Sequence, residues 1–291
     1  MTDHPRTEAL IAQLENLWAC FDELFDSFST ADWQKRHGDD WTLADVPYHL
    51  AYYDTEIIAF PLKQGPELAD SDRIEVNSMA ALHSWNASQF ARRSAYSDPH
   101  KAVARWQTTR QEILDQLEGM TDADLERPTW MALTQSRGWR TAEFACVACL
   151  AHGWIEFMEL RHYAEREAPE PAPEVTHTAL DAFLRLHQSL LDRNAAGNRE
   201  FTLVWEITGP GGGAWTTRVA GGETSLSQGR ASDADLTLRM SPLVFASWWN
   251  GQIDLSDAIA GGQVDASDQG ALATFNALFP PPDPDAALPI A

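Results

Sequence analysis

Apolar residues recur at intervals of three or four in the first part of the chain. Between Thr7 and Ser27 they are Leu10, Ile11, Leu14, Leu17, Phe21 and Leu24. This spacing is close to the 3.6-residue period of an α-helix that buries one face. Similar patterns predict four more helices. The next one is capped by Thr42 or Asp45, and Pro47 favours the later start. The others lie within 71–94, from Pro99 (capped by Asp98) to Gly119, and over 141–164. The first 165 residues are therefore predicted to be helical.

The pattern changes after the segment EREAPEPAPEVTH, residues 165–177. Its prolines disfavour helix and central strand, so we predict a linker there. Beyond it, a helix over 180–194 precedes alternating segments that are typical of strands. These segments are FTLVWEITG, AWTTRVAGG, ETSLSQG and ADLTLRM, with a hairpin at PGGG, and helices follow at SPLVFASWWNG, LSDAIAGG and DQGALATFNALF. We predict an α+β chain with a helical domain over 1–164, a linker over 165–178, a second domain over 179–280 and an irregular tail over 281–291.

Composition narrows the classes of partner. The 291 residues include 43 acidic and 21 basic side chains, for a net charge of −22. A surface this negative repels nucleic acid and anionic lipid, so neither is expected as a partner. An anionic substrate would need a local basic pocket. The N-terminus has no signal-peptide pattern, and no apolar run approaches the roughly 20 residues of a membrane helix. With only three cysteines, we predict a cytoplasmic protein with reduced thiols.

A histidine within WTLADVPYHLAYYD raises the question of a metal site. At about 100° per residue, His49 lies at the edge of the apolar stripe of its predicted helix, where a histidine is more often a core residue than a ligand. His152 and Glu156 are four residues apart on the last predicted helix, so their side chains share one face. Two histidines and a carboxylate suit a divalent metal with one position open. Glu159 and His162 lie on the same predicted helix, so the choice of ligands stays open. The alternative is that His152 and Glu156 form an ordinary helix-surface pair without metal.

Two other motifs are interpreted as structural. Cys146, Cys149 and His152 form C-x-x-C-x-x-H, but this spacing spreads the side chains over about 120° of one helix. No second cysteine pair is present, so both cysteines are predicted to be buried, not ligands. The glycine-rich TGPGGGAW leads into a predicted strand and has no following Lys-Ser/Thr, so it is interpreted as a hairpin loop.

The helical half resembles a known family. The segments WTLADVPYHLAYYD, HSWNASQFARR and CLAHGWIE are similar to the DinB/YfiT-like metalloprotein superfamily, in the branch of the mycothiol-dependent maleylpyruvate isomerases. The resemblance implies a four-helix bundle that holds a zinc-type metal through a histidine of the second helix and two last-helix residues four apart. The isomerase pattern aligns with Ala148 and His152, and Ala148 cannot bind metal. The wider superfamily pattern aligns with His152 and Glu156. The predicted ligands are therefore His49, His152 and Glu156.

The second half resembles the sterol carrier protein type 2 family over about 180–279. The segment from GRASDADL to FNALF has the order strand, helix, NG turn, short helix, glycine pair and final helix. This resemblance implies an α/β module with a mostly antiparallel sheet. Phe245, Trp248 and Trp249 would line an apolar pocket there, although packing in the core explains the same aromatics.

The two resemblances imply a function. The first implies a metal-dependent enzyme that uses a low-molecular-weight thiol such as mycothiol, as an isomerase or S-transferase, on a small electrophilic substrate. Zinc is the expected metal, with nickel and iron as alternatives. From charge alone, Arg92, Arg93 and Arg218 are predicted to offset an anionic substrate. The alternative is a non-enzymatic protein that binds an apolar ligand and has a degenerate metal site. A monomer or a homodimer is expected.

Overall fold

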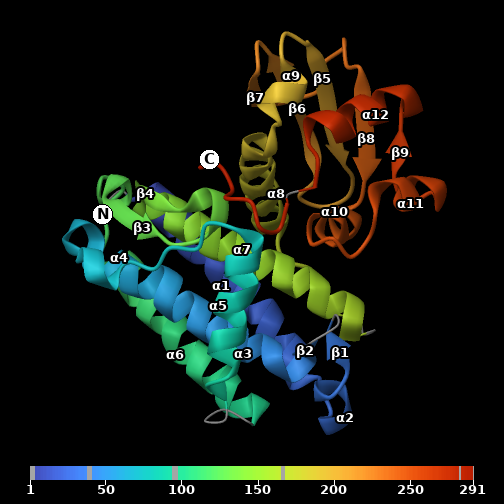
Figure 1. Cartoon of the computed structure of the whole chain (residues 1–291). Coiled ribbons are helices and arrows are strands. Elements are labelled where there is room, and N and C mark those ends of the chain that lie inside the picture. Colours follow the sequence, from blue (N-terminus) through green and yellow to red (C-terminus); the bar gives the residue numbers. More distant parts are fainter. Residues whose placement is uncertain (1–3, 38–40, 94–97, 165–167, 282, 291) are drawn as a thin grey trace. The chain divides into compact units, whose positions relative to one another are not determined.

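The computed structural model describes residues 4–37, 41–93, 98–164, 168–281 and 283–290. The chain divides into two compact units, each described here by itself. The N-terminal unit comprises residues 1–171 together with 284–290, and the C-terminal unit comprises residues 172–283. Figure 1 labels the helices and strands of both. No helix in the described part of the chain has the length and apolar character of a membrane span.

The N-terminal unit is mostly helical, as predicted. Its helices are α1 (Pro5–Asp26), α2 (Thr30–Trp33), α3 (Val46–Tyr53), α4 (Phe60–Gln64), α5 (Met79–Phe90), α6 (Pro99–Glu118) and α7 (Ala142–Ala164). The apolar positions predicted for α1 form its buried face, where Phe21 packs on Trp106 of α6 and Phe157 of α7 with ring centroids 4.9 and 5.0 Å apart. Because α3 also packs on α6, the core is formed by α1, α3, α6 and α7, in agreement with the four-helix bundle that the family resemblance implies.

Helix starts follow their local chemistry. Asp98 Oδ1 accepts the backbone N–H of His100, which caps α6 as predicted. The later start for the second helix is also confirmed, since α3 begins at Val46, next to Pro47. After α3 the chain continues as a π-helical turn, Asp54–Ala59. Pro61 follows in α4 and has no N–H for a regular ladder. Such π-helical turns often lie at functional sites.

Two expectations about local structure are wrong. The first 165 residues also contain short antiparallel strand pairs: β1 (Arg36–His37) with β2 (Trp41–Thr42), and β3 (Pro128–Met131) with β4 (Gly138–Thr141). Strands of two to four residues leave no clear alternation in a sequence. The helix predicted over 180–194 is α8 (Pro173–His187), so the end of the predicted linker is helical. Proline is tolerated in a first helical turn because the N–H it lacks has no partner there.

The C-terminal unit is built on one sheet that is mostly antiparallel, as the family resemblance implies. Its strands are β5 (Phe201–Ile207), β6 (Gly213–Ala220), β7 (Glu223–Gln228), β8 (Leu236–Met240) and β9 (Asp265–Ala266), in the order β7-β6-β5-β8-β9. Only the β5–β8 pair is parallel among these neighbours. The predicted hairpin between β5 and β6 is confirmed, with Gly209 and Gly211 at positive φ. The remaining helices are α9 (Arg193–Ala196), α10 (Pro242–Trp249), α11 (Leu255–Ala260) and α12 (Gln269–Leu278).

A buried histidine lies in the aromatic core of this unit. His187, the last residue of α8, is 2% exposed, and its ring lies 4.5 Å from Phe279 and 5.2 Å from Trp205. Its Nδ1 atom is buried without a hydrogen-bond partner. Burial among apolar rings lowers the pKa of His187 to about 3, so the histidine is neutral in the folded protein.

This histidine is expected to make the C-terminal unit sensitive to acid. Its pKa is lower in the folded than in the unfolded chain, so the stabilisation it confers is complete above about pH 6.5 and falls as the pH drops toward 3. Between pH 7 and 5 the loss is about 2 kcal/mol. Urea unfolding of the wild type and of His187→Phe, with His177→Phe of the same helix as control, measures it. If the wild type and His187→Phe lose stability in parallel, His187 is not the acid-sensitive group.

Candidate metal centre

Three residues selected from the sequence converge in the N-terminal unit. His49 lies on α3, while His152 and Glu156 lie one turn apart on α7. The Nε2 atoms of the two histidines are 3.0 Å apart. Glu156 Oε1 is 3.6 Å from His49 Nε2 and 3.5 Å from His152 Nε2. The three residues thus offer one ligand atom each within 4.8 Å of the others. The structure brings all three predicted ligands together.

The site is largely shielded from solvent. His49 is 4% exposed and Glu156 is 8% exposed, while the side chain of His152 retains 17%. The ring of Tyr53 stacks on that of His152, with centroids 3.7 Å apart and planes at 19°. Trp41 packs on His49, and the two ring centroids are 4.9 Å apart. Packed aromatic side chains therefore hold both imidazoles in place.

A hydrogen-bond chain orients His49. The Tyr52 hydroxyl donates to Asn86 Oδ1 at 3.0 Å, and it lies 3.0 Å from His49 Nδ1. Because that hydroxyl proton is already used, the hydroxyl accepts from His49 Nδ1–H. This assigns the tautomer of His49 from the network and leaves the lone pair of Nε2 facing His152 and Glu156. Metal-binding histidines usually have such an outer hydrogen bond.

The charge states at neutral pH suit a cation. Burial lowers the pKa of His152 to about 3, so this imidazole is neutral. Burial alone would raise the pKa of Glu156, but the neighbouring histidines together outweigh burial and keep the carboxylate ionised. Neutral histidine and ionised carboxylate are the forms that bind metal.

One carboxylate oxygen has no protein partner. Glu156 Oε2 is buried without a hydrogen bond, as is His152 Nδ1. An unpartnered buried polar atom usually destabilises a fold, and a charged one more so. A divalent cation between the two histidines and Glu156 would compensate this carboxylate. The donor set therefore fits a metal ion of the zinc type.

The structure adds one residue that the sequence analysis did not name, His37, and places it beside Glu159. His37 of β1 lies with its Nε2 3.2 Å from Glu159 Oε2, and these two form a second possible ligand group with Glu156. Glu159 was weighed as an alternative ligand because it shares the last helix. His37 had no signal, because it lies in a two-residue strand outside any helical pattern. His162, the other alternative, is exposed and belongs to neither group.

Both cysteines of the C-x-x-C motif are buried, as predicted. Cys146 and Cys149 are free and buried, and neither appears in a ligand group found among the described residues. Burial raises the pKa of Cys146 to about 12, so its thiol is protonated. Cys149 Sγ lies 3.5 Å from Asp54 Oδ1 and donates to it.

The three predicted substrate arginines lie in different settings. Arg93 pairs with Asp45, which precedes α3. Arg218 of β6 pairs with Asp233 at 2.8 Å. Arg92 is exposed in the segment after α5. Their role in substrate binding stays a prediction.

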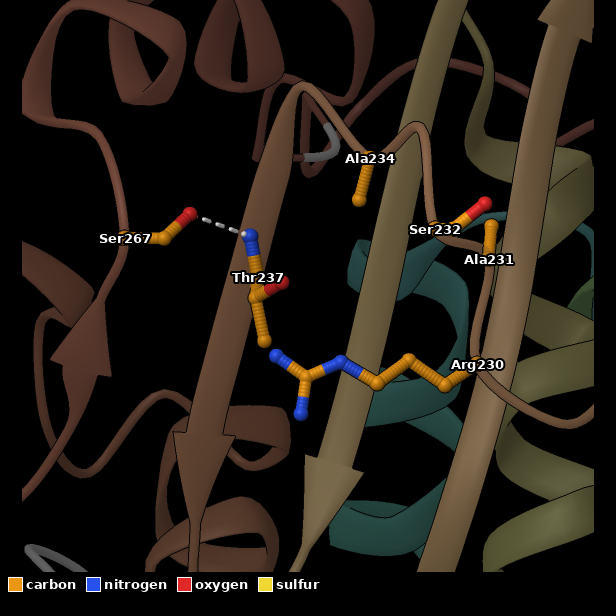
Figure 2. A pocket seen from close by; sticks show the side chains of 6 residues that line it. All are labelled: Arg230, Ala231, Ser232, Ala234, Thr237 and Ser267. Carbon is orange, nitrogen blue, oxygen red and sulfur yellow. Dashed lines mark hydrogen bonds between the residues drawn. The ribbon is translucent and has the colours of Figure 1, made fainter.

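Two features of the C-terminal unit bear on ligand binding. Phe245 is fully buried and its ring packs 5.8 Å from that of Trp248, which favours core packing for this aromatic. A separate hollow of about 420 Å³ is shown in Figure 2. It is lined by Arg230, Ala231, Ser232, Ala234, Thr237 and Ser267. Arg230 pairs with Glu206 at 2.8 Å, so its charge is already compensated. None of the predicted site residues lines this hollow.

Comparisons with known proteins identify both halves. The model of the DinB superfamily matches residues 13–157, and that of the SCP-2 sterol transfer family matches residues 180–274. No curated protein matches the sequence significantly.

One solved structure aligns over most of this chain. The crystal structure of the mycothiol-dependent maleylpyruvate isomerase aligns over 90% of this chain and 92% of its own, with a TM-score of 0.52 and 10% identity. At this identity the likeness concerns the fold.

Two shorter likenesses have low TM-scores. The sec-alkylsulfatase Pisa1 from Pseudomonas sp. aligns over 52% of this chain, with 18% identity and a TM-score of 0.33, and the chain spans only 26% of its length. Sterol Carrier Protein 2 from Yarrowia lipolytica aligns over 33% of this chain and 77% of its own, with 13% identity and a TM-score of 0.23. Neither adds to the family matches. The chain therefore joins a DinB superfamily domain to a domain of the SCP-2 sterol transfer family.

Proposed function

We propose that this protein is a metal-dependent enzyme that uses a low-molecular-weight thiol such as mycothiol on a small electrophilic substrate. The observation that carries the proposal is the buried set of His49, His152 and Glu156, with one orphaned carboxylate oxygen. The fold shared with the mycothiol-dependent maleylpyruvate isomerase supports the choice of a thiol. A thiolate nucleophile would support either an isomerase or an S-transferase reaction.

His49, His152 and Glu156 would hold the metal, zinc by preference, with nickel and iron as alternatives. When bound, such an ion lowers the pKa of a thiol and keeps it as a thiolate near neutral pH. Tyr52 fixes the donor atom of His49, and Tyr53 fixes the ring of His152. A thiolate that adds to an activated alkene allows rotation about the former double bond, and one that opens an electrophile gives a transferase.

Arg92 and Arg93 are proposed to compensate the charge of an anionic substrate, which the net charge of −22 otherwise repels. Arg218 is proposed for the same role from the C-terminal unit. The competing function is binding of an apolar ligand without catalysis, and core packing of Phe245 gives that alternative less support.

The test begins with metal content and continues with turnover. We expect the purified protein to contain divalent metal, and we expect the metal-loaded protein with mycothiol to isomerise maleylpyruvate or to conjugate monochlorobimane. Either activity should disappear when the metal is chelated and return when zinc is added. His162→Ala, an exposed histidine of α7, should react like the wild type. A protein without metal that binds a fluorescent fatty acid would support the alternative function instead.

Tyr52→Phe is expected to weaken metal binding about 10–100-fold, the usual effect of losing an outer hydrogen bond to a ligand. The variant keeps the ring but leaves His49 Nδ1 without its hydroxyl partner. Competition with a chromophoric zinc chelator measures the change. Tyr48→Phe removes a buried hydroxyl that bonds the Gln89 carbonyl instead, and it is the matched control. Equal zinc affinities for the two variants would contradict an orienting role for Tyr52.

A further inference from the structure

Glu156 belongs to two groups of possible ligands. In the first it accompanies His49 and His152, and in the second it accompanies His37 and Glu159. Its Oε1 atom is the one that lies 3.5–3.6 Å from the histidines of the first group. Its Oε2 atom is buried and has no hydrogen-bond partner. A carboxylate that belongs to two ligand groups can offer one oxygen to each of them.

The second group has the character of a ligand set. His37 and Glu159 are buried to about the same degree as Glu156, and their Nε2 and Oε2 atoms are 3.2 Å apart. His37 Nε2 is thus paired with a carboxylate, while Glu156 Oε2 in the same buried group has no hydrogen-bond partner. Burial of polar atoms without compensation is unfavourable, which points to a missing partner.

The two groups are also held as one structure. The ring of Trp41 lies 5.9 Å from that of His37 at an angle of 21°, and 4.9 Å from that of His49. Tyr163 of α7 also packs on His37, and the two ring centroids are 5.0 Å apart. Both imidazoles are therefore fixed by neighbours that do not use their Nε2 atoms.

We infer that the site binds a second divalent cation through His37, Glu159 and Glu156, with Glu156 bridging two ions. The inference rests on the metal site proposed above and extends it. One ion bound through Oε1 at the first group would use a single oxygen of Glu156, whereas two ions would use both oxygens. Carboxylate-rich sites suit zinc, manganese or iron(II). Two divalent ions held by two carboxylates and three imidazoles would carry excess positive charge, which would attract an anionic substrate to an otherwise negative protein.

The experiment counts bound ions in the full chain. Chelated protein is reloaded with zinc, and elemental analysis is made after removal of free metal. The wild type is expected to retain two equivalents, and His37→Ala and Glu159→Gln one each. His49→Ala is also expected to retain one. His162→Ala, with an exposed histidine on the same helix as Glu159, should keep two. Circular dichroism checks that each variant is folded.

Manganese gives a second readout. Two manganese ions that share a carboxylate interact magnetically, so the loaded wild type should show an exchange-coupled spectrum by electron paramagnetic resonance. His37→Ala should show isolated ions. One equivalent that survives in His37→Ala and is lost in His49→Ala would overturn the second site and leave the proposed function intact. One equivalent that is lost in His37→Ala and survives in His49→Ala would overturn the first site. A protein that binds no metal at all would overturn both sites.

Discussion

Alanine at His49 or at His152 is expected to remove one equivalent of bound divalent metal and the thiol-dependent reaction with it. Each substitution deletes one of three ligands whose donor atoms lie within 4.8 Å of one another. Losing a direct ligand should lower affinity by more than the roughly 10–100-fold of an outer partner. Elemental analysis after dialysis measures the loss, and turnover with mycothiol gives the functional readout.

Both variants are expected to keep most of their helix content, which circular dichroism measures. His162→Ala on α7 controls for loss of a histidine from the same helix. Glu156→Ala should reduce metal content less cleanly, because Glu159 lies one turn away and offers a second carboxylate. Full metal content in both histidine variants would place the ion elsewhere and make His49 a core residue.

Much of this site was accessible from the sequence because it depends on helical periodicity. His152 and Glu156 are four residues apart on α7, so their placement on one face follows from helix geometry. His49 lay at the edge of an apolar stripe, where periodicity alone favoured a core residue. The facing of α3 and α7 had to come from the family resemblance, since no local rule pairs residues 103 positions apart.

What the sequence did not reveal depends on contacts without a local pattern. His37 approaches α7 from a two-residue strand, and a segment this short has no periodicity to detect. The start of α8 was misjudged because proline breaks a helix interior but fits a first turn, and Pro173 occupies such a turn. Composition predicted a linker in the proline-rich segment but could not locate the residue at which the helix begins.

Asp54→Asn is expected to stabilise the N-terminal unit at neutral pH by up to about 3 kcal/mol. Asp54 opens the π-helical turn and is buried, and its Oδ2 accepts a hydrogen bond of 2.6 Å from Trp106 Nε1. Burial raises the pKa of Asp54 to about 6 from an ordinary value of 3.8, although the hydrogen bonds from Trp106 and Cys149 oppose it. A difference of about two pKa units corresponds to about 3 kcal/mol. Asparagine has no charge to bury and still accepts from Trp106.

The pH dependence gives the effect its sign. Because its pKa is higher in the folded than in the unfolded chain, the folded protein binds the additional proton between pH 3.8 and 6. The stability conferred by protonated Asp54 is complete below about pH 3.8 and is lost as the pH rises through 6. The difference in unfolding free energy between Asp54→Asn and the wild type should therefore grow by about 2 kcal/mol between pH 4 and 7.

Trp106→Phe separates the hydrogen bond from the burial of the ring. It keeps an aromatic ring against Phe21 but removes the donor to Asp54, so it should lower stability at pH 7 by about 1–3 kcal/mol. In Asp54→Asn the same substitution should have a smaller effect, because no buried carboxylate loses a donor. Urea unfolding of both single variants and the double variant measures this coupling. If the Asp54→Asn and wild-type curves stay parallel from pH 4 to 7, Asp54 is ionised throughout, and burial has not raised its pKa.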